Sequence, residues 1–193
     1  MSKYWKPLSI ANHQAISDEI YDYVVNHTEL LTGKEYYFTR QHISYMLYHC
    51  PLLFEFLKKH DLTPVFVGVI LCNKQRGNIP MHRDHDGLKP WLRLLWPVRN
   101  CQGSKTKIWQ VPDGAGVNAV DSNNILFVNF PPNQERELIE EFELVSPVIF
   151  DASSPHSVES NPEIKDRRIS LTIGFDQELP ISKSFKAWST FQD

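Results

Sequence analysis

The stretch Arg168–Phe175 reads RISLTIGF, and polar and apolar side chains alternate along it as far as Ile173. In an extended strand successive side chains point to opposite faces, so the two kinds of residue lie on different faces. The apolar residues are Ile169, Leu171 and Ile173, and the polar ones are Arg168, Ser170 and Thr172. We expect the apolar face to pack beneath helices and the polar face to line a cavity that holds a ligand.

Several segments upstream of this strand also have the composition of strands. Val65–Leu71 (VFVGVIL) is an apolar, β-branched run that is typical of a buried strand. Further strands are predicted at Trp91–Val98, Thr106–Val111, Ile125–Phe130 and Pro147–Phe150. The turn-forming sequences GNIP, NCQGS, PDGAG and FPPN separate these segments. We also expect one short helix among them, at Gln134–Phe142 (QERELIEEF).

Helices are predicted ahead of the strands. Residues 13–26 carry apolar side chains at helical spacing, and these are Ile16, Ile20, Tyr23 and Val24. Residues 40–60 form a second helical stretch, which we expect to be interrupted near Pro51 because proline breaks the helical hydrogen-bond pattern. Helices followed by many short strands predict a mainly β fold, a sandwich or barrel with helices packed on one face.

Composition narrows the class of protein. A chain of 193 residues with 41% hydrophobic and 12% aromatic residues fits one globular domain. The net charge is -3, and no basic stripe stands out, which makes nucleic acid a poorly supported partner. The three cysteines are isolated, so we expect no disulfide framework and a reducing, cytoplasmic setting. We also expect no secretory leader and no membrane span.

A candidate metal site joins the stretch His82-Arg83-Asp84 to the distant His156. On an extended segment His82 and Asp84 project to the same face, so one metal ion can take both. Two imidazoles and one carboxylate suit a non-haem Fe(II), with positions left for a co-substrate and oxygen. The nearby His85 and Asp86 are alternative ligands, but the spacing of three from His82 to His85 fits a strand poorly.

An arginine stands twelve residues after the last histidine. Arg168 is a fixed cation of the kind that clamps a dicarboxylate with two parallel hydrogen bonds. Ser170 shares its strand face and offers a hydroxyl to the same anion. The neighbouring Arg167 is the alternative clamp, and it points the opposite way on the strand. We favour Arg168 because Ser170 and Thr172 share its face.

Three motifs together resemble a known superfamily. IPMHRDHDG, SPHSVESN and RRISLTIGF are similar in order and separation to the Fe(II)/2-oxoglutarate-dependent oxygenases with a double-stranded β-helix, the jelly-roll or cupin-like core. They resemble the prolyl-hydroxylase-like and aspartyl-hydroxylase-like members, and WLRLLWPVRNCQGSKTKIWQ is similar to small oxygenase-like proteins of phages and marine bacteria. The resemblance covers residues 64–176. With the single domain expected from the chain length, over residues 1–193, this gives helical support in 1–63, the oxygenase core in 64–176 and a tail in 177–193.

The resemblance also implies roles for particular residues. It makes His82, Asp84 and His156 the iron ligands and the catalytic centre, and it makes Arg168 and Ser170 the site of 2-oxoglutarate. The activity it implies is hydroxylation, with O2, of an amino acid, a protein side chain or a small metabolite. Because Asp84 is present, halogenation is disfavoured, whereas desaturation and cyclisation stay open. The resemblance leaves open the identity of the substrate and the oligomeric state.

Substrate contacts are predicted on the strands that follow the metal motif. Arg93, Trp96 and Trp109 are the candidates, and Trp91 and Arg99 lie on the same segments. Arg93 stands out because it lies in mid-strand among apolar residues and needs a reason to be there. For each candidate the alternative is an ordinary role as a core aromatic or a surface arginine.

Three other functions stay open. The first is a cupin-like protein that binds a metal or small ligand without turnover. The second is a zinc or manganese isomerase or hydrolase on the same barrel, although such sites more often use three histidines, or two with a glutamate. The third is a phage structural or interaction protein with a jelly-roll shape, which would have no use for the metal ligands.

Overall fold

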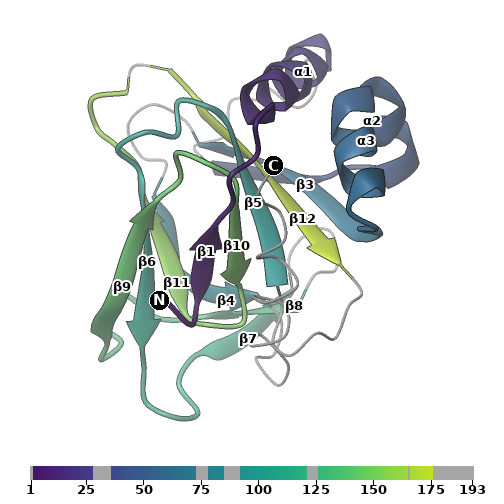
Figure 1. Cartoon of the computed structure of the whole chain (residues 1–193). Coiled ribbons are helices and arrows are strands. Elements are labelled where there is room, and N and C mark those ends of the chain that lie inside the picture. The colour runs from purple at the N-terminus through teal and green to yellow at the C-terminus, as the bar shows by residue number, and fades with distance from the viewer. Residues whose placement is uncertain are drawn as a thin grey trace.

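The computed structural model describes residues 2–27, 36–72, 78–84, 92–120, 126–164 and 166–175, without the side chains of 36–40, 120 and 126. Two antiparallel sheets of six strands each make up most of the regular secondary structure in this part of the chain (Figure 1). The predicted tail 177–193, together with Trp91, His85 and Asp86, lies outside the described residues. The division of the chain at residues 63 and 176 therefore stays a prediction.

Each sheet draws on strands from distant parts of the sequence. The first sheet, in spatial order, consists of β1 (Trp5–Pro7), β10 (Val148–Asp151), β5 (Leu92–Arg99), β12 (Arg168–Phe175), β3 (Pro64–Cys72) and β2 (Tyr36–Arg40). The second sheet consists of β7 (Val117–Val120), β8 (Leu126–Asn129), β4 (Ile79–Asp84), β11 (His156–Glu159), β6 (Lys105–Gln110) and β9 (Glu137–Glu143). This mainly β architecture confirms the predicted fold class.

The helices lie where the sequence predicts them. α1 spans His13–Asn26, and the second helical stretch divides into α2 (Ile43–His49) and α3 (Pro51–Lys59). The break falls at Cys50, and Pro51 occupies the first turn of α3, where a missing amide hydrogen breaks no helical bond. The helical stretch begins at Ile43 and not at residue 40, because Arg40 ends β2. Within the described residues no helix is long and apolar enough to cross a membrane.

The principal core lies between the helices and the first sheet. The apolar face of β12 is buried there, with Ile169, Leu171 and Ile173. Ile16 and Ile20 of α1 and Leu53 of α3 are buried against it. Figure 1 shows the helices packed against the sheet that contains β3, β5 and β12. The predicted packing of the apolar face of β12 beneath helices is therefore confirmed. The three cysteines are buried free thiols, in agreement with the expected lack of a disulfide framework.

The predicted helix at Gln134–Phe142 is wrong, because Glu137–Glu143 forms β9 at the edge of the second sheet. β9 pairs with β6 along its whole length, and this pairing brings Lys105 to Glu141 as an ion pair. Phe142 is buried against Trp5, with ring centroids 4.7 Å apart. Sheet pairing and this aromatic contact outweigh the helical propensity of the glutamates and leucine.

Removal of a core side chain from β12 tests the packing described above. We expect Leu171→Ala, at a fully buried position, to lower the free energy of unfolding by about 2–5 kcal/mol, because the helices cannot fill the cavity. The control is Leu138→Ala on β9, where the side chain is 44% exposed. Urea unfolding of both variants measures the difference. Equal and small losses in the two variants would contradict the assignment of Leu171 to the core.

Candidate metal centre

His82, Asp84 and His156, here called the triad, come together between the sheets. β4 and β11 pair in antiparallel fashion with His82 directly opposite His156, and their ring centroids lie 4.3 Å apart. His82 Nε2 is 3.7 Å from Asp84 Oδ1, and one ligand atom from each residue lies within 4.8 Å of the others. Within the part of the chain described, this is the one group of three such side chains able to hold a metal ion.

The main chain sets the tautomer of both imidazoles. His82 Nδ1 lies 2.8 Å from the carbonyl oxygen of Pro80, and His156 Nδ1 lies 2.8 Å from that of Ser154. A carbonyl oxygen only accepts, so each Nδ1 must carry the hydrogen and donate it. Each ring therefore keeps its lone pair on Nε2, which is the form of histidine that binds a metal.

Asp84 is held from two sides. Its backbone N–H donates to the carbonyl oxygen of Ala152 at 2.8 Å, and Arg93 Nε donates to its Oδ2 at 3.3 Å. Burial by itself raises the pKa of the Asp84 carboxyl, but Arg93 and the two imidazoles outweigh burial and leave the pKa lowered. The carboxylate is therefore ionised at neutral pH. Its side chain stays 28% exposed, so one side of the triad is open to solvent.

His156 is the buried member of the triad. Burial, and next the neighbouring His82 imidazole, lower the pKa of His156 from 6.5 to about 3. Its ring meets that of Phe150 edge-on, with centroids 4.7 Å apart. Phe150 lies on the first sheet and His156 on the second, so the imidazole points into the space between the sheets. It is neutral at physiological pH and can act as a ligand.

A turn organised by Asp151 presents His156, and the sequence reasoning missed it. The buried Asp151 carboxylate accepts hydrogen bonds from Ser153 N–H at 3.0 Å, Ser153 Oγ at 2.6 Å and Ser154 Oγ at 3.3 Å. The same turn places the Ser154 carbonyl that anchors His156. An Asp with serines two and three residues later, as in Asp151-Ala152-Ser153-Ser154, is a recognised turn signal, so the sequence did contain the information.

The predicted clamp residues lie on the inner face of β12. Arg168 and Ser170 are buried, and Arg168 Nη1 lies 3.8 Å from Cys72 Sγ. Among the described residues neither Arg168 Nε nor Ser170 Oγ has a hydrogen-bond partner. A buried guanidinium without a counter-ion is unfavourable, so the surroundings of Arg168 suit an anion. Arg167 precedes the strand and is only half-buried.

The three predicted substrate residues have different surroundings. Arg93 faces the space between the sheets and contacts Asp84. Trp96 is fully buried on the helix side, where Nε1 donates to Ser17 Oγ at 3.0 Å. Trp109 Nε1 donates to Ser157 Oγ at 2.8 Å, and Ser157 faces the opposite way from His156 because the two alternate along β11. The structure therefore does not bring the two tryptophans to the triad.

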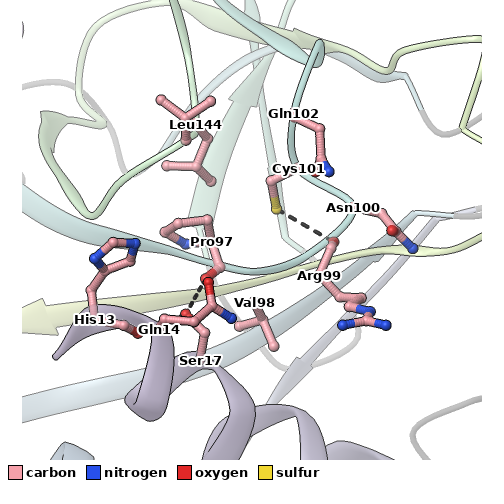
Figure 2. Close-up of a pocket in the computed structure, with 11 residues that line it drawn as sticks. His13, Gln14, Ser17, Pro97, Val98, Arg99, Asn100, Cys101, Gln102 and Leu144 are labelled. Carbon is pink, nitrogen blue, oxygen red and sulfur yellow. Dashed lines mark hydrogen bonds between the residues drawn. The ribbon is translucent and has the colours of Figure 1, made fainter.

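A separate pocket of about 230 Å³ lies between the start of α1 and the end of β5 (Figure 2). No member of the triad and neither clamp residue lines it. Two of its polar side chains bind main-chain carbonyls: Ser17 Oγ donates to Pro97 at 2.7 Å, and Cys101 Sγ lies 3.5 Å from the carbonyl oxygen of Arg99. We find no arrangement of catalytic groups among its described lining residues.

Comparison with known proteins finds similarity in structure and none in sequence. No protein-family model matches the chain, and no curated protein matches it. Among solved structures it is similar to the non-haem alpha ketoglutarate dependent carbocyclase SnoK from nogalamycin biosynthesis, with a TM-score of 0.53 and 12% identity over 89% of this chain and 79% of that chain.

Two further solved structures are similar at a lower level. AviO1 from Streptomyces viridochromogenes Tue57 has a TM-score of 0.49 and 15% identity, over 92% of this chain and 91% of that chain. A Pseudomonas putida prolyl-4-hydroxylase has a TM-score of 0.48 and 13% identity, over 89% of this chain and 91% of that chain. At such identities the likeness concerns the fold, and the fold comparison rests on SnoK.

The burial of His156 predicts a dependence of stability on pH in the metal-free protein. Its pKa is about 3 in the fold and near 6.5 when unfolded, so acidification between these values favours the unfolded chain. The loss is at most about 1.4 kcal/mol per pH unit for this one proton. With a chelator present, the urea concentration at the midpoint of unfolding should fall more steeply from pH 7.5 to 4.5 in wild type than in His156→Gln. Parallel curves would show that His156 is not shielded from protonation.

Proposed function

We propose that this chain, which has the jelly-roll fold of a non-haem α-ketoglutarate-dependent enzyme, is an Fe(II)- and 2-oxoglutarate-dependent oxygenase. In this proposal it hydroxylates an amino acid, a protein side chain or a small metabolite. The observation that carries the proposal is the meeting of His82, Asp84 and His156 between the sheets, with ligand atoms within 4.8 Å of one another.

The donor atoms of the triad fit the metal of this proposal. Two imidazoles whose Nδ1 is bound to a carbonyl offer Nε2, and one ionised carboxylate offers oxygen, which is the donor set of non-haem Fe(II) oxygenases. In this role the backbone carbonyls of Pro80 and Ser154 hold the rings, as the partners of metal-bound histidines do. When bound, Fe(II) and 2-oxoglutarate supply the oxidising chemistry with O2.

Arg168 and Ser170 are the proposed site of the distal carboxylate of 2-oxoglutarate. Both side chains are buried on the inner face of β12, and both retain hydrogen-bonding atoms without a partner among the described residues. A carboxylate would satisfy the Arg168 guanidinium and accept from the Ser170 hydroxyl. Arg167 is the less suitable clamp, because it is half-buried and lies just outside the strand.

The open side of the triad is the proposed approach for substrate. His82 and Asp84 are 18% and 28% exposed, whereas His156 is buried against Phe150. Substrate and O2 would reach the centre past His82 and Asp84, and the packed apolar side behind His156 would exclude water. In this proposal the substrate would approach the metal from the side of His82 and Asp84, and the anion clamp on β12 would hold 2-oxoglutarate from a different strand.

Binding experiments test the proposal. In anaerobic calorimetry we expect wild type to bind Mn(II) and then 2-oxoglutarate, and Arg168→Ala to bind Mn(II) normally. Loss of a charge-assisted pair worth about 1.5–3 kcal/mol should weaken 2-oxoglutarate binding by the Arg168→Ala variant about 10- to 100-fold. Arg167→Ala is the matched control and should bind both as wild type does. His156→Ala should lose Mn(II) binding.

The same experiment separates the enzyme from a cupin-like binding protein without turnover. Iron-dependent release of succinate from 2-oxoglutarate in air, even without the native substrate, supports an oxygenase. Metal binding with no 2-oxoglutarate binding, or equal binding by wild type and Arg168→Ala, would overturn the proposal.

A further inference from the structure

Three residues form a row across the centre of the first sheet. Gly174 on β12 pairs with Phe66 on β3 and with Arg93 on β5, so the three lie side by side. The guanidinium carbon of Arg93 lies 4.4 Å from the centroid of the Phe66 ring, although β12 runs between their strands. The Arg93 side chain therefore reaches across Gly174 and rests on the aromatic ring, a favourable contact for a guanidinium.

Gly174 is what makes this path possible. A Cβ atom built on Gly174 would lie 2.1 Å from Arg93 Nη1, closer than atoms can approach without a shift, and would make a tight contact of 3.3 Å with its Cζ. Any other residue at this position would push the guanidinium away from the sheet surface. Glycine is therefore needed at position 174 for a steric reason, which is that the Arg93 guanidinium fills the space where a Cβ atom would lie.

Arg93 is buried, with 3% of its surface exposed, and its position determines what it touches on the other sheet. Its Nε donates to Asp84 Oδ2 at 3.3 Å, whereas Asp84 Oδ1 lies 3.7 Å from His82 Nε2. The two oxygens of the carboxylate thus have different neighbours: one faces the guanidinium, and the other faces the imidazole.

We infer that Arg93 is a positioning residue that holds Asp84 by one oxygen, so that only Oδ1 is offered to the metal. A carboxylate can bind a metal ion through one oxygen or through both. If Oδ2 were released, Asp84 would take a second position that 2-oxoglutarate or O2 needs. This inference rests on the proposed function, and it replaces the expectation that Arg93 contacts substrate.

Two variants remove the restraint in different ways. Arg93→Met keeps the length of the side chain but removes its donors and its charge. Gly174→Ala keeps the arginine and displaces it through the steric contact described above. The matched control is Arg99→Met, which removes an exposed arginine from the other end of the same strand.

The readout is the number of water molecules on Mn(II) bound to the protein, obtained from the broadening of its paramagnetic resonance lines in water enriched in oxygen-17. We expect one water fewer in Arg93→Met and Gly174→Ala than in wild type and Arg99→Met, because the second oxygen of Asp84 replaces it. The affinity of the Mn(II)-loaded variants for 2-oxoglutarate should fall by about tenfold or more.

Mn(II) affinity distinguishes this role from a general loss of structure. Removal of a nearby cation favours binding of a divalent ion, so Arg93→Met should bind Mn(II) at least as tightly as wild type. A variant that is merely damaged would lose Mn(II) and 2-oxoglutarate affinity together. If Arg93→Met does not fold, Gly174→Ala carries the test, because it keeps the arginine and only moves its guanidinium.

The outcomes separate this inference from the proposed function. If wild type binds Mn(II) and 2-oxoglutarate but the variants keep its water count and its affinities, the inference about Arg93 is wrong and the proposed function stands. If wild type binds no Mn(II), the proposed function fails, and the role of Arg93 fails with it.

Discussion

β4 and β11 pair with His82 directly opposite His156, and the candidate metal centre depends on this register. Side chains alternate along a strand, so a slip of one residue would turn one of the two imidazoles to the outer face of the sheet. Backbone bonds next to the triad fix the segment that leads into β11: Asp84 N–H of β4 donates to Ala152, and Trp109 N–H of β6 donates to Pro155, both at 2.8 Å. The turn built on Asp151 contains the first of these acceptors and ends just before the second.

The two faces of the first sheet have opposite characters, and this division separates stability from chemistry. The outer face of β12 is buried in the apolar core beneath α1 and α3, which supplies the hydrophobic stabilisation of the fold. The inner face holds Arg168 and Ser170, and the neighbouring strand β5 adds Arg93. Burial of these charged and polar side chains costs free energy of folding. The ion pair between Arg93 and Asp84 offsets part of that cost.

Local pattern was enough to predict much of the fold and the members of the candidate site. Alternation along β12 identified both of its faces, and the spacing of His82, Asp84 and His156 anticipated their meeting. Pattern failed where a distant partner decides the outcome. The β9 segment has the composition of a helix and becomes a strand by pairing with β6. The faces of Trp96 and Trp109, and the contact between Arg93 and Asp84, depend on the register of strands far apart in the sequence. The short strands β1, β2 and β7 were not expected for the same reason.

Both imidazoles are anchored by the carbonyl two residues earlier in their own strand or turn. A carbonyl belongs to every residue type, so mutational drift at residues 80 and 154 changes the side chains there and keeps the acceptors. The protonation pattern of the ligands is therefore encoded in the path of the backbone. A lineage of such proteins can diverge almost completely in sequence and still inherit the same ligand nitrogens, provided that the two strands keep their alignment.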